Sequence, residues 1–206
     1  MNLKIVLFIF DDITILDLIG PYEVLSKIPN AEIRIVGLEK KDYKDKYGLT
    51  IKADCSIDEI TETDILLIPG GAGIDSLLHN EDLIKWITEI DKSTKLTTSV
   101  CAGSIILAQA GLLDGKNCTT HWRRKDQLRK YNVNIVNKRY IQDGKYITSA
   151  GVSAGIDMAL YLVSKIAGDQ AAQIIQLAIE YDPKPPFDSG TPNKAPKEMV
   201  NYLISK

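Results

Sequence analysis

A cysteine stands between an apolar run and a helical pattern, in the segment LTTSV-Cys101-Ala102-Gly103-Ser104. Small residues after a nucleophile suit the tight, strained strand-to-helix turn called a nucleophile elbow. Such a turn places the thiol at the carboxyl end of a parallel strand, where open α/β sheets bind ligands, and at a helix N-terminus, which favours thiolate. We therefore predict that Cys101 is a nucleophile. The alternative is a buried cysteine that packs as a small hydrophobic residue.

A second glycine-rich turn follows another apolar run, in ILLIP-Gly70-Gly71-Ala-Gly73. Its backbone amides, together with that of Ala102, could form a hole that stabilises developing negative charge on a substrate. The alternative is an ordinary strand-to-helix turn. The segment has neither the dinucleotide fingerprint nor the lysine of a phosphate loop, so we expect no nucleotide cofactor.

Two further side chains could move protons. Asp17 lies within the apolar stretch Leu16–Ile19, where a carboxyl group is either desolvated, with a raised pKa, or held by hydrogen bonds. It could serve Cys101 as a general acid or merely cap the helix that we expect near Pro21. His121 follows in the order expected of a cysteine–histidine pair, although a lone histidine is more often structural.

Composition excludes several classes of protein. The chain has 206 residues and a formal net charge of -2 without a basic block, which argues against a nucleic-acid-binding face. Three cysteines in a chain of this size indicate free thiols in a reducing compartment. The chain has only two histidines, which argues against a zinc site. Met1–Phe10 is too short to span a membrane and lacks a cleavage site. We expect a cytoplasmic protein without a metal or organic cofactor.

The apolar and amphipathic stretches alternate, as in a parallel sheet covered by helices on both faces. We predict an α/β fold with a flavodoxin-like, doubly wound, mostly parallel sheet. Strands are expected at Lys4–Phe10, Glu32–Leu38, Ile65–Pro69, Leu96–Val100, Asn117–Thr120 and Lys145–Ser149, with a strand and turn over Asn132–Asp143. Helices are expected at Pro21–Lys27, Asp82–Lys92, Ala102–Ala110, Arg123–Tyr131, Ser153–Ala167 and Lys197–Ile204.

The chain is expected to form a single domain, residues 1–206, with a C-terminal arm. Asp182–Pro196 holds five of the eight prolines, so this segment cannot be regular helix or central strand. We expect the arm to close over the site or to pack on a partner subunit.

Six segments carry a family resemblance: LDLIGPYEVL, PGGAGIDSL, TSVCAGSIILAQAGLL, TTHW, GVSAGIDMAL and QLAIEYDPKPPFDSGTP. Together they resemble the ThiJ/PfpI superfamily of the class I glutamine amidotransferase-like fold, and most closely its isonitrile hydratase branch. The resemblance covers essentially the whole chain. It implies that Cys101 is the nucleophile, Asp17 the acid beside it, and Gly70, Gly71 and Ala102 the backbone donors, in a homodimer. One residue departs from the hydratases, which carry a threonine where this chain has Ala102.

The expected function is hydration of an isonitrile, a small electrophile, to an N-substituted formamide by a lyase without a metal. The first alternative is a glyoxalase- or deglycase-like enzyme acting on α-oxoaldehydes, with His121 as the proton shuttle. The second is a redox- or ligand-sensing module, because an exposed thiolate at Cys101 would oxidise readily. No interaction with nucleic acid or membrane is expected.

Overall fold

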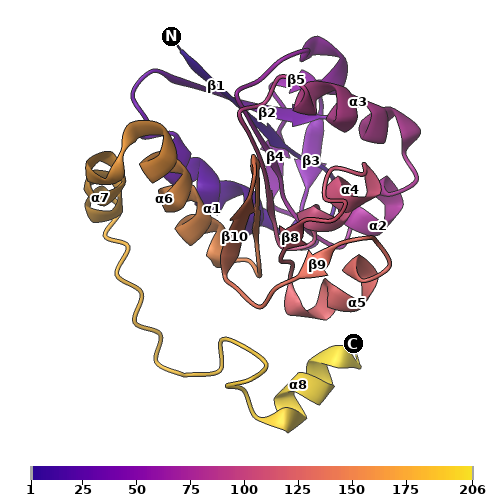
Figure 1. Ribbon diagram of the computed structural model, residues 1–206, viewed down its shortest axis with the longest axis vertical. Helices are drawn as coiled ribbons and strands as arrows, with labels where there is room; N and C mark the ends of the chain where they lie inside the picture. The colour runs from indigo at the N-terminus through magenta and orange to yellow at the C-terminus, as the bar shows by residue number, and fades with distance from the viewer. Residues whose placement is uncertain (1, 206) are drawn as a thin grey trace.

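A seven-stranded sheet forms the centre of the molecule in the computed structural model, which describes residues 2–205 (Figure 1). The strand order is β10-β11-β7-β6-β1-β2-β5, and every neighbouring pair is parallel except β10 and β11. This is the doubly wound, mostly parallel sheet predicted from the sequence. The strands are β1 (Leu3–Phe8), β2 (Ala31–Gly37), β5 (Cys55–Ser56), β6 (Ile65–Ile68), β7 (Leu96–Val100), β10 (Tyr140–Asp143) and β11 (Tyr146–Ser149).

Helices cover both faces of the sheet, which explains why the central strands read as continuous apolar runs (Figure 1). One face carries α1 (Ile15–Leu25), α6 (Ala154–Ala167) and α7 (Asp169–Ala178). The other face carries α2 (Ile74–Leu77), α3 (Glu81–Asp91), α4 (Gly103–Gln109) and α5 (Lys125–Leu128). All four residues of β6 are buried, as are the last four of β1, so the core lies on both sides of these strands.

Several boundaries differ from the sequence predictions. The first helix begins at Ile15, so the prediction that Pro21 occupies its first turn is wrong: Pro21 lies inside α1. Because a proline has no N–H, the carbonyl of Asp17, four residues earlier, has no helical donor at this position. The segment Asn117–Thr120 does not join the central sheet. Only β8 (Asn117–Cys118) is a strand, and it pairs with β9 (Asn134–Ile135) in a separate ribbon.

The sequence patterns also miss several elements. A small hairpin of β3 (Asp42–Lys44) and β4 (Thr50–Lys52) follows β2, and α7 follows α6 after Gly168. The edge strand β5 and the short helix α2 were not predicted either. The helix expected over Arg123–Tyr131 is shorter, with a 3₁₀ turn at Trp122–Arg124 and then α5.

Residues 182–196 contain no helix or strand and connect α7 to α8 (Lys197–Ile204). Figure 1 shows this arm running away from α7 and bringing α8 below α5. No helix within residues 2–205 has the length and apolar character needed to cross a bilayer. Assignment of the whole chain to a single domain stays a prediction.

Candidate active site

Cys101 occupies a strained turn between β7 and α4. Its φ of 57° lies in the left-handed region that non-glycine residues seldom adopt. The Cys101 N–H donates to the carbonyl oxygens of Ala150 and Ser149, at 2.8 and 3.1 Å. The Thr120 hydroxyl donates to the Cys101 carbonyl at 2.8 Å. These bonds hold the backbone in its unusual conformation, so the tight strand-to-helix turn predicted from the sequence is present. The role of Cys101 as a nucleophile stays a prediction.

The elbow requires a glycine at position 103, where a Cβ atom would lie 2.1 Å from the carbonyl oxygen of Ile68. We expect Gly103→Ala to lower the free energy of unfolding by about 3 kcal/mol, because neither backbone can move without disturbing β6 or the elbow. Chemical denaturation of the purified variant would measure the change. A Cβ on Gly190 would meet nothing within 4 Å, so the control Gly190→Ala should stay within about 0.5 kcal/mol of wild type. Equal stabilities for the two variants would contradict this account of the turn.

Asp17 projects from α1 into the interior and is completely buried. The Gly70 N–H donates to its Oδ2 at 3.0 Å. Its other oxygen, Oδ1, is also buried and has no partner of ordinary hydrogen-bond geometry among residues 2–205. Burial raises the pKa of Asp17 to about 7, against the weaker lowering effects of the Gly70 amide and the Cys101 thiol. Near neutral pH this carboxyl group can therefore both hold and release a proton.

The thiol of Cys101 and the carboxyl group of Asp17 form a coupled pair, since the pKa of each depends on the other. Burial, followed by the charge of Asp17, raises the pKa of Cys101 well above its ordinary value. The Ala102 N–H, a hydrogen-bond donor to the sulfur, opposes this shift. The amide at the helix N-terminus thus favours thiolate, as expected, but desolvation and the neighbouring carboxylate outweigh it.

The glycine loop after β6 lies directly against the elbow. A Cβ on Gly70 would come within 2.5 Å of the Ala102 nitrogen and 2.9 Å of Asp17 Oδ2. A Cβ on Gly71 would lie 2.4 Å from the carbonyl oxygen of Asp12, at a φ of 154°. Only glycine at positions 70 and 71 therefore lets this loop lie so close to the elbow and to the backbone after β1. The Gly70 N–H donates to Asp17, and the Ala102 N–H donates to the Cys101 thiol. That the amides of Gly70, Gly71 and Ala102 stabilise a substrate oxyanion stays a prediction.

His121 is not hydrogen-bonded to Cys101 in the described structure. Its Nδ1 accepts the Arg123 N–H at 3.3 Å, and its ring lies against Gly151. Burial, then the charges of Arg123 and Arg124, lowers the pKa of His121 and favours neutral imidazole. The structure thus brings Asp17 to the thiol and keeps His121 nearby without forming the cysteine–histidine pair.

Arg124 is a charged neighbour that sequence reasoning does not single out. Its charge lowers the pKa of Cys101, although less than burial and Asp17 raise it. The guanidinium group is held by Asp75 of α2, with Nη1 2.9 Å from Oδ2. The one feature of the sequence that points to Arg124 is its position in the basic segment Trp-Arg-Arg-Lys, which directly follows His121. The other two thiols, Cys55 and Cys118, are free and buried away from this set, and burial raises the pKa of Cys118 to about 11.

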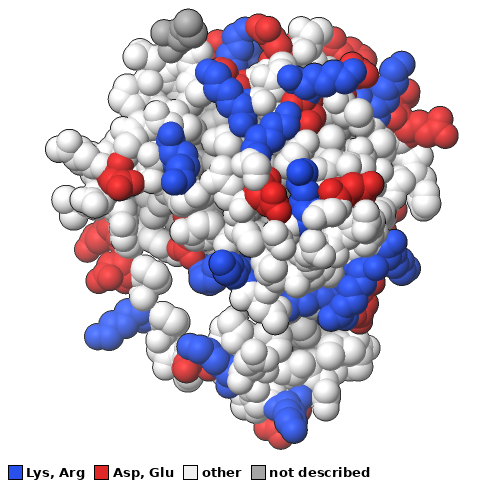
Figure 2. Space-filling model, in the orientation of Figure 1, with Lys and Arg blue, Asp and Glu red and all other residues white. Residues whose placement is uncertain are grey.

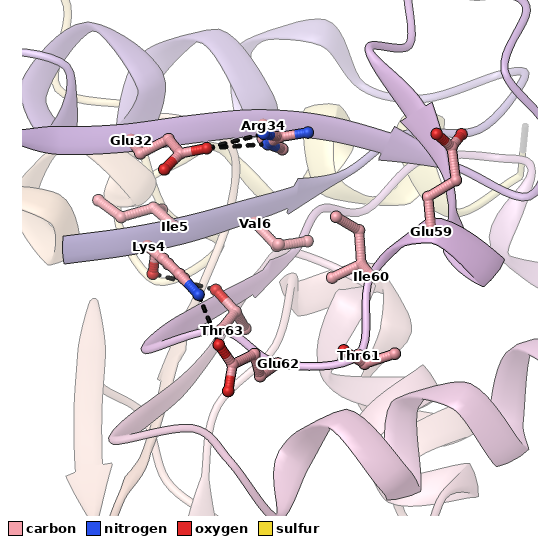
Figure 3. A pocket seen from close by; sticks show the side chains of 10 residues that line it. All are labelled: Lys4, Ile5, Val6, Glu32, Arg34, Glu59, Ile60, Thr61, Glu62 and Thr63. Carbon is pink, nitrogen blue, oxygen red and sulfur yellow. Dashed lines mark hydrogen bonds and ion pairs between the residues drawn. The ribbon is translucent and has the colours of Figure 1, made fainter. Parts of the chain in front are cut away.

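A cavity of about 370 Å³ lies elsewhere, at the amino ends of β1 and β6 (Figure 3). Its side chains pair with one another, Lys4 with Glu62 and Arg34 with Glu32, as the dashed lines in Figure 3 show. This cavity contains none of the candidate site residues, since Cys101 follows the carboxyl end of β7. Among residues 2–205, no group of three or more His, Cys, Asp or Glu side chains is placed to hold a metal ion.

Comparisons with known proteins fit this geometry. The model of the DJ-1/PfpI family matches residues 3–165. The isonitrile hydratase of Pseudomonas putida is 38% identical over 201 residues, which are 98% of this chain and 88% of the hydratase. The deglycase PfpI of Pyrococcus furiosus is 28% identical over 142 residues, covering 68% of this chain and 83% of the deglycase. A crystal structure of a ThiJ/PfpI family protein from Pseudomonas syringae superposes with a TM-score of 0.96 at 30% identity, covering 100% of this chain and 86% of that one.

Proposed function

This chain belongs to the DJ-1/PfpI family, and on that basis we propose that it is a cysteine-dependent lyase that hydrates isonitriles to N-substituted formamides. The observation that carries the proposal is the coupled pair of Cys101 and Asp17, a buried thiol beside a buried carboxyl group with a pKa of about 7. The similarity to an isonitrile hydratase over nearly the whole chain supports it.

The pair suits an addition reaction that begins and ends with a neutral thiol. Asp17 accepts the thiol proton while the sulfur attacks the terminal isonitrile carbon, and it then delivers that proton to the same carbon. The product is a thioimidate, in which the former isonitrile carbon carries the sulfur, one hydrogen and a double bond to nitrogen. Water adds to this carbon, and collapse of the adduct breaks the carbon–sulfur bond. The N-substituted formamide leaves, and Cys101 regains its proton.

The raised pKa of Cys101 is compatible with this sequence of steps. A resting thiolate is unnecessary when a base lies beside the thiol and takes its proton during attack. The Ala102 amide, bonded to the sulfur, stabilises the charge that develops there. The methyl side chain of Ala102 supplies no hydroxyl for water, so water must be oriented by other groups.

Turnover tests the proposal directly. Purified protein is incubated with an alkyl isonitrile, and the formamide is quantified by chromatography against a boiled-protein control. Absence of formamide from the wild-type protein would overturn the proposed function.

A glyoxalase- or deglycase-like activity is the second candidate, favoured by Ala102 and by the similarity to a deglycase. Replacing His121 separates the two. We expect His121→Ala to lower isonitrile hydration less than about tenfold, because loss of a true acid–base catalyst costs 10²-fold or more. The measurement is kcat for formamide release, with His79→Ala, which changes an exposed histidine, as the control.

Consumption of methylglyoxal by the same variants completes the comparison. Lactate formation by wild type that is lost in His121→Ala but kept in His79→Ala, without isonitrile turnover, would favour the second candidate instead.

We further propose that the protein acts as a homodimer in the cytoplasm on a small electrophile, without an organic cofactor or metal. An exposed apolar stripe on α1 supports self-association: Leu16, Ile19 and Tyr22 are 39%, 38% and 39% exposed. Sensing through oxidation of Cys101 is the less favoured function, because a buried thiol with a raised pKa reacts slowly with peroxide.

A further inference from the structure

A cavity of about 530 Å³ opens beside His121, and every charged side chain that lines it is basic. These side chains are Lys125, at the start of α5, and Lys138 and Arg139, just before β10. No aspartate or glutamate lines the cavity. The chain as a whole is slightly acidic, so this grouping contrasts with the rest of the surface.

The inner wall of this cavity is in contact with the elbow. It includes Thr120, whose hydroxyl donates to the Cys101 carbonyl, and Ala150, whose carbonyl accepts the Cys101 N–H. It also includes Leu16, the residue before Asp17. Cys101 itself is 7% exposed. Neither Cys101 nor Asp17 lines the basic cavity, which borders them through Thr120, Ala150 and Leu16.

A nearby carboxylate neutralises one of the three basic side chains, Arg139, but not the two lysines. Asp157 pairs with Arg139 and also accepts the Tyr181 hydroxyl at 2.6 Å. In contrast, Lys125 donates to the neutral side chain of Asn137, and neither Lys125 nor Lys138 forms an ion pair with any residue in the range 2–205. Figure 2 shows blue side chains gathered over the α5 region of the surface. Two ammonium groups thus remain available to an anion.

The C-terminal arm forms one side of this partly open cavity. Gly190, Thr191, Pro192 and Asn193 line the same cavity, opposite residues of the folded body. This places part of the proline-rich arm next to the basic side chains. A substituent bound there is held between the arm and the body, where partial exclusion of water strengthens interactions between charges.

We propose that this cavity binds an anionic substituent of the substrate, so that the preferred substrate is an isonitrile whose organic group ends in a carboxylate. The inference rests on the proposed function for the identity of the reacting group, whereas the charge selection rests on the cavity alone. Lys125 and Lys138 hold the carboxylate, and the reactive carbon lies at Cys101.

Alkylation of Cys101 tests charge selection without requiring hydratase activity. The probes are three iodoacetamides with the same reactive head and an N-alkyl chain ending in a carboxylate, a neutral amide or an ammonium group. In each case the thiolate displaces iodide and forms a thioether, and mass spectrometry follows modification of Cys101. Because the heads are identical, a difference in rate reports on binding of the chain end. A series of chain lengths shows which spacing reaches the cavity.

We expect the carboxylate probe to react about three- to tenfold faster than the neutral probe, after correction with glutathione as the reference thiol, and the ammonium probe to react more slowly. In the Lys125→Gln/Lys138→Gln variant the carboxylate and neutral probes should alkylate Cys101 at about the same rate. In the wild type the rate advantage of the carboxylate probe should shrink as salt is added. The matched control is Lys130→Gln, an exposed lysine on the same segment that does not line the cavity, and it should keep the advantage.

Equal rates for the three probes on wild type, or an advantage that survives the double substitution, would overturn the inference. Its failure is distinguishable from failure of the proposed function, because alkylation requires only a thiol whereas formamide release requires the whole reaction. Where formamide is formed, ω-isocyanoalkanoates should be preferred over their methyl esters by a similar factor, and preference for the esters would count against the inference.

Discussion

Replacing Cys101 with alanine should lower formamide production by at least about 10³-fold, because no covalent thioimidate can form without the sulfur. The substitution keeps the small size that the elbow requires, and alanine can be held at the same backbone angles by the hydrogen bonds to Ala150 and Thr120. The loss should therefore lie in kcat rather than in folding. Formamide release, followed by chromatography, and a thermal unfolding curve on the same sample would separate the two effects.

The matched control is Cys118→Ala, which removes another free, buried thiol. Per mole of folded protein, it should hydrate isonitriles at nearly the wild-type rate. Undiminished turnover in Cys101→Ala, or equal losses in the two variants, would exclude Cys101 as the nucleophile.

Replacing Asp17 with asparagine should lower kcat by about 10²- to 10⁴-fold, the range for loss of a general acid–base catalyst. Asparagine keeps an oxygen that can accept the Gly70 N–H, so the local structure should survive. At the same time the pKa of Cys101 should fall, because the charge of Asp17 raises it in the wild type. A variant whose thiol ionises more easily but turns over more slowly would identify proton transfer, rather than thiolate supply, as the contribution of Asp17.

The same substitution has an effect on stability whose sign depends on pH. The pKa of Asp17 is about 7 in the folded protein and near its ordinary value of 3.8 when unfolded, so the folded state holds the proton more tightly. The contribution of Asp17 to the free energy of unfolding is therefore fully present below about pH 4 and is lost as the pH rises through about 7. The loss amounts to at most about 4 kcal/mol. Asp17→Asn should lack this loss and be more stable than wild type above neutral pH.

Urea unfolding at several pH values checks this, with Asp58→Asn, which changes an exposed carboxylate, as the control. Parallel pH profiles for wild type and Asp17→Asn would contradict the raised pKa, and unchanged kcat would remove Asp17 from the proposed mechanism.

The sheet and its elbow could be predicted because their signals are local. An apolar run followed by Cys-Ala-Gly-Ser indicates a strand and a tight turn, and continuous apolar strands indicate cover on both faces. Asp17 was recognisable as a carboxylate in an apolar stretch. The start of α1 was misplaced because Pro21 resembles a first-turn proline, whereas the helix begins after Thr14, whose side chain makes no capping hydrogen bond.

Other properties of the site depend on contacts between distant segments. The pKa of Cys101 is raised by burial and by Asp17, which no local pattern around the cysteine encodes. Arg124 acts on the thiol from a turn more than twenty residues further along, and its own position depends on Asp75. Likewise, the prolines of the arm predict an irregular segment but not the cavity that residues 190–193 help to enclose.

The hydrogen bond from Gly70 to Asp17 joins residues 53 positions apart in the chain. It therefore has a consequence for folding kinetics. Such long-range contacts form only after the entropy of closing a large loop has been lost, which ties them to the cooperative assembly of the sheet. Asp17, Gly70 and Cys101 lie on three different segments, so a nascent or partly folded chain contains both the thiol and the carboxyl group but does not hold them together. During folding, this cysteine is thus an ordinary thiol, and its tuned chemistry arises only with the complete native topology.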